Sequence, residues 1–432
     1  MSTNRRLIET HQQAVRSLLT PVFKRLRAAT PDSVAVDSPE LLGRVVAMEV
    51  TTAIPLPPFD NSQMDGYAVR AEDVATASPS LPVTLTLGFT TAAGDSQLTH
   101  VPGTASPVMT GAVIPLGADA VVPVELTLPP RFPKLNRRGE PDPTGNVDIA
   151  SAAPAGQFVR KRGEDAPSGA PILPAGTRLT PTRVGALAAA GCTTVQVLPR
   201  LRVLLCSTGD EISQVSEPTQ ASEPSQLEIG KIHDANTPML AAALREAGAE
   251  VDTLRCGDQA GALQEALASV SASYDLIITS GGISAGAFEV VREAFAPLGA
   301  EFLSVAMQPG GPQGLGEIVL PGGAVPAVCF PGNPVSAFIS AECFVLPLLR
   351  EYAGLPAERP RVQRQLAHDT SSPLEKHQVR RGRIEADGRV SLSGPGSHLL
   401  SELALADVLV QLPLGQDSFL ENTPVETWRI ND

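Results

Sequence analysis

Between residues 200 and 352 the chain alternates short apolar runs with stretches of helical spacing, and this alternation restricts the fold more than any other feature of the sequence. The apolar runs lie at 201–206, 250–254, 275–279 and 301–306, and the helical spacing lies at 237–247, 260–271 and 288–296 and again after Pro334. Strands that alternate with helices build βαβ units around a parallel sheet. The pattern therefore predicts a doubly wound α/β domain over residues 200–352.

Outside this region, proline and glycine divide the chain into short β-like runs. The protein has 40 prolines and 37 glycines, densest between residues 53 and 174, where runs such as 83–87 and 120–124 end in turn residues. Past residue 355 the helical spacing stops again, and runs such as 389–392 and 407–412 predict a terminal β domain. A chain of 432 residues, at roughly 100–200 residues per domain, is expected to form two to four domains.

The first 30 residues are expected to form an amphipathic helix rather than a signal peptide. Apolar residues recur at helical spacing, among them Leu7, Val15, Leu19 and Val22, without the continuous apolar core of a secretory signal. We expect this helix to pack on a later domain. No run approaches the roughly 18 consecutive apolar residues of a transmembrane helix, so no membrane span is expected.

The charge and the cysteines exclude several classes of protein. The 46 acidic residues outnumber the 33 lysines and arginines, and the net charge of −13 argues against a general nucleic-acid-binding or anionic-membrane surface. Any anionic ligand must therefore meet local positive potential. The five cysteines are widely spaced and never form a C-x-x-C pair, which is typical of neither a disulfide framework nor a zinc site and predicts a reducing cytoplasm.

Three loops that directly follow predicted strands combine glycine with hydroxyl side chains. They are residues 207–211, 280–286 and 331–336, and in an open α/β sheet such loops meet at the carboxyl edge, where ligands bind. Glycine lets backbone N–H groups approach an oxyanion, and a following helix adds its dipole, so the loops are predicted phosphate or oxyanion cradles. An isolated Gly-Gly pair is more often a simple turn, but three such loops at one edge favour a site. The predicted substrate-binding residues are Ser207, Gly209, Asp210, Gly281, Gly282, Ser284, Gly332, Asn333 and Ser336.

Carboxylates near the same loops point to a site for magnesium and phosphate. Glu211 follows the first strand, Asp258 the second, and Glu289 the glycine loop. Mg²⁺ commonly takes one or two carboxylates together with substrate phosphates, which reconciles an acidic chain with an anionic ligand. Glu289 and Asp258 are the predicted metal ligands. Taken singly, each carboxylate is more often a helix cap or a solvated charge, and Asp234 is predicted to cap the helix that follows it.

Two further stretches lie in the predicted β region. Residues 57–69 form a long polar stretch ahead of a strand, and residues 160–165 place three cations beside two carboxylates, as either a solvated turn or a phosphate holder near a metal. The six histidines show no paired ligand spacing, and the sequence contains no G-x-S-x-G, no P-loop and no G-x-G-x-x-G after a strand. A zinc enzyme, a serine hydrolase and a Rossmann dehydrogenase are therefore disfavoured.

Six motifs, in order along the chain, resemble those of the molybdopterin molybdenumtransferase family, the MoeA family, which is related to the E domain of gephyrin. They are PPFDNSQMDGYAVR (57–70), MTGAVIP (109–115), RKRGED (160–165), STGDE (207–211), TSGGISAG (279–286) and PGNPVSAF (331–338). The resemblance runs from about residue 30 to the C-terminus.

The resemblance implies a homodimer of L-shaped, four-domain subunits. It implies a linking β domain of two segments (30–56 and 157–199), an inserted β domain (57–156), an α/β domain related to molybdopterin adenylyltransferase (200–352) and a C-terminal β-barrel (356–432), with residues 1–29 as a helix on the α/β domain. It also implies the reaction in which adenylylated molybdopterin and molybdate give molybdenum cofactor and AMP, with Mg²⁺ as the cofactor. A molybdopterin adenylyltransferase and acceptor molybdoenzymes are the further partners that it implies.

The resemblance also assigns roles to individual residues. It implies catalytic roles for Asp65 in the MDG motif, Asp165 in GED, Glu211 in GDE, and Glu289, which stands where family members often have aspartate. Thr110 of the MTG motif matches a substrate-binding position, and Arg381 and Ser397 match positions associated with molybdate.

One departure from the family pattern keeps alternatives open. Many members read K-P-G-K-P where residues 308–312 here read Gln-Pro-Gly-Gly-Pro, so Gln308 and Gly311 replace two ammonium groups beside the implied molybdate site. Each lost contact would weaken oxyanion binding by about 1–3 kcal/mol in a desolvated site, unless Arg381, Arg383 or Mg²⁺ replaces the charge. An active molybdenum-inserting enzyme is the leading prediction. The alternatives are a non-catalytic molybdopterin-binding carrier or scaffold, and a molybdopterin adenylyltransferase.

Overall fold

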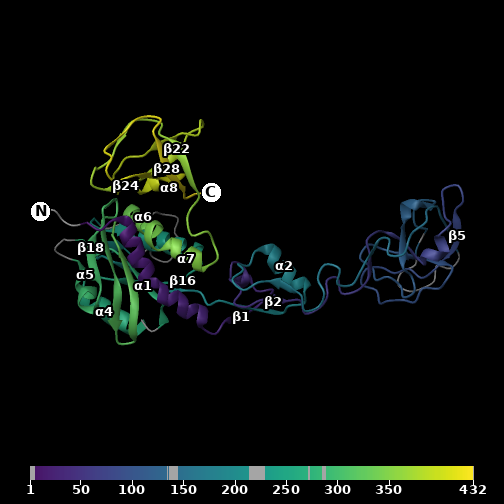
Figure 1. Cartoon of the computed structure of the whole chain (residues 1–432). Coiled ribbons are helices and arrows are strands. Elements are labelled where there is room, and N and C mark those ends of the chain that lie inside the picture. The colour runs from purple at the N-terminus through teal and green to yellow at the C-terminus, as the bar shows by residue number, and fades with distance from the viewer. Residues whose placement is uncertain are drawn as a thin grey trace.

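The computed structural model describes residues 5–133, 135, 145–213, 229–270, 273–284 and 289–431. The chain is elongated: an α/β unit and a terminal β unit lie together at one end, a small β unit lies at the other, and linking segments run between them (Figure 1). No helix within these residues is long and apolar enough to cross a membrane.

The α/β unit is built on a six-stranded sheet of order β16-β13-β17-β21-β20-β18. The strands are β13 (Arg202–Thr208), β16 (Glu250–Cys256), β17 (Leu276–Ser280), β18 (Glu301–Ser304), β20 (Pro312–Leu320) and β21 (Gly323–Phe330). The four strands predicted from the apolar runs are confirmed as β13, β16, β17 and β18. β13, β16, β17 and β21 are parallel to one another, as the βαβ pattern predicts.

Two strands depart from the parallel pattern. β20 and β21 form a long antiparallel hairpin in which Leu320 pairs with Gly323, and β18 pairs antiparallel with β20. A connection of two residues can join only antiparallel strands, so the hairpin makes this side of the sheet antiparallel. The apolar runs of the sequence predict only a parallel sheet, because none of them corresponds to β20.

Helices cover both faces of the sheet, which confirms the doubly wound prediction. α1 (Ile8–Ala28), α3 (Asn236–Glu246), α6 (Pro334–Phe344) and α7 (Leu346–Tyr352) share one core with the sheet, and α4 (Ala260–Val270) and α5 (Val290–Phe295) share the other. The predicted helices at 237–247, 260–271 and 288–296 correspond to α3, α4 and α5. The short 3₁₀ helix η5 (Ala296–Leu298) follows α5.

α1 packs on the α/β unit through an apolar stripe that includes a buried histidine. Val15 and Leu19 are fully buried in the core, and α1 contacts α6, β20 and β21. His11 is also fully buried, with its ring edge-on to Phe344 at a centroid distance of 4.6 Å. Neither of its ring nitrogens has a hydrogen-bond partner in the described part of the chain. Burial, with a smaller contribution from the charge of Arg6, lowers the pKa of His11 to about 4.

The pKa of His11 predicts a loss of stability in acid. The histidine of the unfolded chain binds a proton near pH 6.5, whereas the folded chain binds it only near pH 4, so the unfolded chain holds more protons between these values. The free energy of unfolding should therefore fall by up to about 3 kcal/mol from this residue alone as the pH drops from 6.5 to 4. His11→Phe should remove this component in urea unfolding curves recorded at pH 7 and pH 4.5. His368→Gln, at an exposed site, is the control, and an unchanged pH slope in His11→Phe would contradict the prediction.

The linking unit consists of two paired segments and a helix. β1 (Asp32–Ala35) pairs with β12 (Thr194–Val197), and β2 (Val50–Thr51) pairs with β11 (Pro171–Leu173). The 3₁₀ helix η1 (Pro39–Leu41) and α2 (Pro181–Ala189) lie between these strands in sequence. The sequence analysis expected only β structure here, but Pro181 at the first turn and the alanine-rich run behind it favour a helix.

The inserted unit is a six-stranded sheet of order β7-β4-β6-β5-β9-β8. Its strands are β4 (Gly66–Val69), β5 (Val83–Leu87), β6 (Thr104–Val108), β7 (Ala120–Pro123), β8 (Thr127–Leu128) and β9 (Asn146–Ile149), with 3₁₀ helices η2 (Ala71–Val74) and η3 (Val124–Leu126). Tyr67, Val122 and Ile149 are buried in its core. β3 (Asn61–Ser62) and β10 (Val159–Arg160) pair where the chain enters and leaves this unit.

The terminal unit is a sheet that closes on itself. Its order is β19-β24-β26-β28-β22 with β25 also on β24, and a bridge from Leu366 to Val390 joins the end of β22 to β25. The elements are β19 (Met307–Gln308), β22 (Arg361–Gln365), β23 (Thr370–Ser371), β24 (His377–Ile384), β25 (Val390–Leu392), α8 (Leu400–Ala404), β26 (Val408–Leu412), β27 (Ser418–Phe419) and β28 (Pro424–Arg429). This ring of pairings confirms the barrel. β19 comes from the α/β segment, so a strand outside 356–432 extends the barrel sheet.

Candidate functional site

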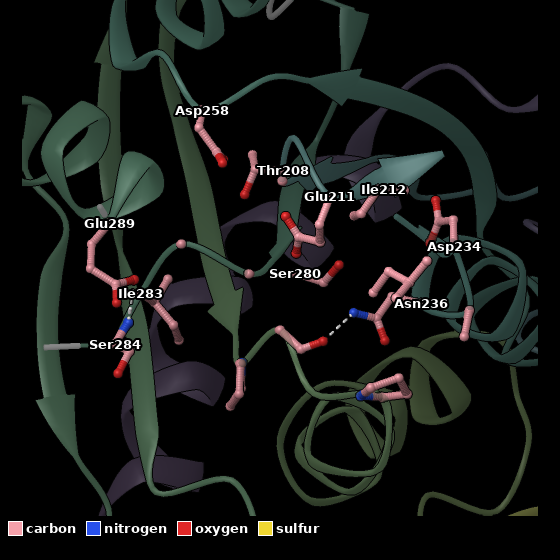
Figure 2. Close-up of a pocket in the computed structure, with 18 of the residues that line it drawn as sticks. Thr208, Glu211, Ile212, Asp234, Asn236, Asp258, Ser280, Ile283, Ser284 and Glu289 are labelled. Atoms are coloured by element: carbon pink, nitrogen blue, oxygen red, sulfur yellow. Dashed lines mark hydrogen bonds between the residues drawn. The ribbon is translucent and has the colours of Figure 1, made fainter. Parts of the chain in front are cut away.

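The loops after three neighbouring parallel strands meet at the carboxyl edge of the α/β sheet. β13 and β21 flank β17, so residues 208–211, 280–284 and 331–334 converge there. A cavity of about 440 Å³ lies between these loops and the start of α3 (Figure 2). Eight of the predicted residues line it: Gly209, Glu211, Asp258, Gly281, Gly282, Ser284, Glu289 and Gly332.

The loop after β17 takes its shape from residues without side chains. Gly281 and Gly282 have φ angles of 99° and 63°, in the left-handed region that favours glycine. A Cβ on Gly282 would lie 2.9 Å from the backbone nitrogen of Val291, and a Cβ on Gly332 would lie 3.2 Å from Cα of Gly281. The loops after β17 and β21 therefore approach each other backbone to backbone.

Glu289 is turned onto the glycine loop. Its Oε2 accepts a hydrogen bond of 2.7 Å from the backbone N–H of Ser284 (Figure 2). Because this N–H is already bonded, the ligand contact predicted for Ser284 is left to its hydroxyl group. Glu289 therefore holds the loop in place, in addition to the metal and catalytic roles predicted for it.

The acidic residues after β13 and β16 tie two loops together. The backbone N–H of Asp210 donates to Oδ2 of Asp258, and the N–H of Asp258 donates to Oδ1 of Asp210, both at 3.1 Å. Asp210 is not among the residues that line the cavity and holds the neighbouring loop in place, while its predicted role in substrate binding stays a prediction. Asp258 and Glu211 do line it. Lys231 donates to the carbonyl oxygen of Asp210 at 2.6 Å and brings a positive charge to the same loop.

Asn236, at the start of α3, is a wall residue that the sequence analysis missed. Its Nδ2 donates to the carbonyl oxygen of Gly332 at 2.7 Å, which connects α3 to the loop after β21 (Figure 2). Oδ1 of Asn236 and Oγ of Ser280 are buried at the cavity and have no hydrogen-bond partner among the described residues. Buried polar atoms without a partner indicate a missing ligand or water. The available signal was a polar residue at a predicted helix start on the carboxyl side of the sheet.

Asp234 makes the capping interaction predicted for it and a second one besides. Its Oδ1 accepts a hydrogen bond of 3.0 Å from the N–H of Thr237 in the first turn of α3. Its Oδ2 lies 3.0 Å from Nη2 of Arg255, and the side chain of Asp234 is 1% exposed. Asp234 is therefore a paired structural carboxylate at the rim of the site.

The carboxylates fit a metal that shares its ligands with a substrate. Within the described residues no three His, Cys, Asp or Glu side chains cluster closely enough to hold a metal ion. Glu211, Asp258 and Glu289 approach one cavity from separate loops. One or two carboxylates completed by phosphate oxygens and water is an ordinary arrangement for Mg²⁺. The residues present fit that arrangement and do not form an all-protein cage.

A second cleft, of about 490 Å³, lies between the α/β unit and the terminal unit. It contains Ser336 and Ser397 of the predicted residues, and Pro312 lines both this cleft and the first cavity. Gln308, which replaces a family lysine, accepts a hydrogen bond of 3.1 Å from Gln378. The charged groups that line the cleft instead are Arg5 and Lys376.

Arg381 is not among the residues that line this cleft, and its predicted association with molybdate stays a prediction. The residue is fully buried, and its Nη2 donates to the carbonyl oxygens of Gly394 and Gly396. Burial lowers the pKa of Arg381. Because Gly396 directly precedes Ser397, the guanidinium group holds the loop that presents Ser397. The sequence could not separate these roles, since both require an arginine at the same place.

Two other predicted substrate-binding residues also lie outside both cavities. Asn333 caps α6, because its Oδ1 accepts a hydrogen bond of 3.2 Å from the N–H of Val335. Ser207 is buried within β13, and its Oγ has no hydrogen-bond partner among the described residues. Both belong to the predicted loops, but neither is among the residues that line the cavity.

Three predicted residues lie far from the cavity in the same chain. Asp65 accepts hydrogen bonds from the N–H and the hydroxyl of Thr110, at 2.6 and 2.8 Å. Asp165 lies at the junction with the linking unit, where its N–H donates to Leu56. The inserted unit that carries Asp65 and Thr110 is at the opposite end of the chain from the α/β unit (Figure 1).

Residues 160–165 form a turn held by two carboxylates, those of Asp60 and Glu164. Asp60 accepts hydrogen bonds from Nζ of Lys161 at 3.0 Å and from the N–H of Arg162 at 2.7 Å. The N–H of Lys161 donates to Glu164 at 2.8 Å. The turn is solvated, and its cations remain at the surface of this junction.

Comparison with known families covers most of the chain. Residues 7–191 match the MoeA N-terminal region (domain I and II), and residues 205–351 match a probable molybdopterin binding domain. The second match contains the cavity loops described above.

Individual relatives match nearly end to end. A Mycobacterium tuberculosis protein named molybdopterin molybdenumtransferase 2 is 39% identical and covers 98% of this chain and 99% of its own length. Molybdopterin molybdenumtransferase of Synechococcus elongatus is 34% identical over 89% of this chain and 91% of its own. The crystal structure of a molybdopterin biosynthesis MoeA protein from Pyrococcus horikoshii OT3 aligns with a TM-score of 0.67 at 26% identity, covering 96% of this chain and 99% of that one.

Proposed function

Because the chain belongs to the molybdopterin molybdenumtransferase family, we propose that it inserts molybdenum from molybdate into adenylylated molybdopterin and releases AMP. The observation that carries the proposal is the convergence of three glycine and hydroxyl loops, with buried unpartnered polar atoms, on one cavity. Such loops suit the phosphates of an adenylylated substrate.

The residues that line the cavity are suited to different roles in the reaction. Gly281 and Gly282 line the cavity and carry no side chain, and Asn236 and Ser280 offer polar atoms to the rest of the substrate. Asp258 and Glu289 would hold Mg²⁺ together with a substrate phosphate, and the ion would neutralise charge as the phosphoanhydride is cleaved. The same carboxylates can orient the water that attacks this bond.

The second cleft is where we place molybdate, as a substrate. It adjoins the first cavity at Pro312, and Arg5 and Lys376 supply charge where Gln308 and Gly311 cannot. Arg381 acts there by positioning the loop of Ser397.

A molybdopterin adenylyltransferase would supply the substrate, and molybdoenzymes would receive the product. The five cysteines are unpaired in the structure, which supports a reducing compartment, the cytoplasm.

The reaction gives a direct test. Purified protein is expected to release AMP from adenylylated molybdopterin only when both molybdate and Mg²⁺ are present, and chelation of Mg²⁺ should abolish release. AMP is quantified by chromatography. Tight substrate binding without AMP release would leave a carrier in place of an enzyme, and release of pyrophosphate from molybdopterin and ATP would indicate an adenylyltransferase.

We also propose a homodimer in which each active site combines residues of two subunits. The inserted unit, which carries Asp65 and Thr110, lies at the opposite end of the chain from the α/β unit and its cavity (Figure 1). Asp165 lies where the inserted unit joins the linking unit. If these residues take part in the reaction, a second copy must bring its inserted unit to the cavity. A shared site of this kind requires a symmetric dimer with two equivalent sites.

Subunit mixing tests the shared site. Asp65→Asn and Glu211→Gln are each expected to be inactive alone. A re-associated mixture should recover about a quarter of the wild-type activity, because half of the dimers are mixed and each of these has one intact site. AMP release before and after mixing is the measurement. A mixture that stays inactive, although sedimentation shows that dimers form and exchange subunits, would contradict the proposal.

A further inference from the structure

A third cavity, of about 210 Å³, lies where the linking unit meets the α/β unit. Four arginines line it, namely Arg44, Arg178, Arg200 and Arg245, against a single carboxylate among its lining residues, Glu246. This accumulation of positive charge stands out in a chain whose net charge is −13. The cavity shares no lining residue with the two described above.

The arginines come from three parts of the chain. Arg44 and Arg178 belong to two paired segments of the linking unit, joined by a bridge between Val45 and Arg178. Arg200 lies in the connection from β12 to β13, and Arg245 is in the last turn of α3. The cavity therefore spans the junction of the two units, and a ligand held by all four arginines would connect them.

Two glycines make room for Arg178 at this junction. Gly43 has a φ of 79°, and a Cβ there would lie 3.0 Å from Nη2 of Arg178. A Cβ on Gly354 would lie 3.2 Å from Cβ of Arg178. The arginine is therefore packed between the linking unit and the end of α7, where a larger neighbour would displace it.

The positive charge of this cavity is only partly compensated within the chain. Arg44 is 8% exposed and uses Nη2 for both Asp32 and the carbonyl oxygen of Leu198, while its Nε is buried without a hydrogen-bond partner among the described residues. Nε of Arg178 is also buried and has no hydrogen-bond partner among the described residues. Such donors indicate a partner that the chain itself does not supply.

The other charged groups do not supply that partner. Within the described residues, the guanidinium group of Arg200 makes no hydrogen bond or ion pair, and Arg245 donates only to the carbonyl oxygen of Val251, at 2.7 Å. Glu246 is 66% exposed and lies 3.5 Å from Arg359, outside the set of four.

We propose that this cavity binds a small tetrahedral dianion, either inorganic phosphate or the phosphate group of a small metabolite, and thereby holds the linking unit against the α/β unit. Guanidinium groups present planar pairs of donors that match the oxygens of a phosphate group. The cavity, of about 210 Å³, has room for a phosphate and for a small group esterified to it. The site is additional to the proposed reaction, because none of its residues touches the proposed catalytic cavity.

Phosphate binding to the full-length protein tests the site. Inorganic phosphate is titrated calorimetrically into the wild-type protein and into Arg200→Gln, which removes a guanidinium group that makes no bond within the described chain. Arg131→Gln, at an exposed site of the inserted unit, is the matched control for charge. We expect Arg200→Gln to bind phosphate at least tenfold more weakly at this site, Arg200→Lys to retain most of the affinity, and Arg131→Gln to equal the wild type.

Two further measurements decide how the site is used. Hydrogen exchange at residues 43–46 and 198–201 should slow with phosphate in the wild type but not in Arg200→Gln. Titration with glycerol 3-phosphate separates the two sources, because only a site open to esters would bind it as tightly as inorganic phosphate. Phosphate bound in the glycine-loop cavity would be unaffected by Arg200→Gln, so equal affinity in both proteins would overturn the proposal. A change in sedimentation without a change in phosphate affinity would make the cavity a contact between subunits instead.

Discussion

Gly282→Val is expected to lower kcat/KM for AMP release by about a hundredfold, the effect typical of losing one oriented N–H donor to an oxyanion. Gly282 has a φ of 63°, which a β-branched residue rarely adopts. Its Cβ would lie 2.9 Å from the backbone nitrogen of Val291 and 3.2 Å from Oγ1 of Thr208, so the loop must move away from both. This movement withdraws the loop N–H groups from the phosphates. Initial rates of AMP release at several substrate concentrations measure the effect.

Gly323→Val is the matched control for this substitution. Gly323 also has a positive φ, 122°, and lies in the hairpin between β20 and β21, where nothing approaches the position of a Cβ within 4 Å. The control carries comparable backbone strain without crowding the cavity, so it should lose stability but retain near wild-type kcat/KM once folded. Equal losses of kcat/KM in the two variants would show that the loop has no specific role in the reaction.

Glu342→Gln is expected to lower the free energy of unfolding by about 3–5 kcal/mol, because it removes the buried charge that balances the buried Arg350 and the partly buried Arg359. The side chain of Glu342 is 1% exposed. Its oxygens accept hydrogen bonds from Nη2 of Arg350 at 2.9 and 3.0 Å and from Nη2 of Arg359 at 2.8 Å. Glutamine keeps the volume but leaves the guanidinium group of Arg350 without a counter-charge among the described residues, while Arg359 keeps only the exposed Glu246 at 3.5 Å.

Urea unfolding followed by the fluorescence of Trp428, the single tryptophan of the chain, measures this loss. Trp428 lies in β28 and packs against the hydrophobic core that contains α6, the helix of Glu342. Its fluorescence therefore reports on the interface between the α/β unit and the terminal unit. Glu358→Gln is the control. It breaks an exposed ion pair with Arg361 and should cost less than about 0.5 kcal/mol. A loss of the same size in both variants would mean that Glu342 contributes no more than a surface charge.

The sequence could predict the cavity because its wall is continuous with the sheet. A residue that directly follows a parallel strand must lie at the carboxyl edge, whatever the rest of the fold does. Gly209, Gly281 and Gly332 therefore reach the cavity by their position in the chain alone. The direction of a side chain in the same loops depends on neighbours from elsewhere, so the loop pattern could not show that Asn333 and Ser207 lie outside the set of residues that line the cavity.

What the sequence determined by itself is the local structure and the family. Strand and helix periods depend on neighbouring residues, and the six motifs are short enough to be recognised without knowledge of the fold. What only the tertiary structure decided are relations between distant segments. The burial of Arg381, the distance of Asp65 from the cavity and the meeting of Arg44, Arg178, Arg200 and Arg245 depend on how units pack, and packing joins residues that share no local pattern.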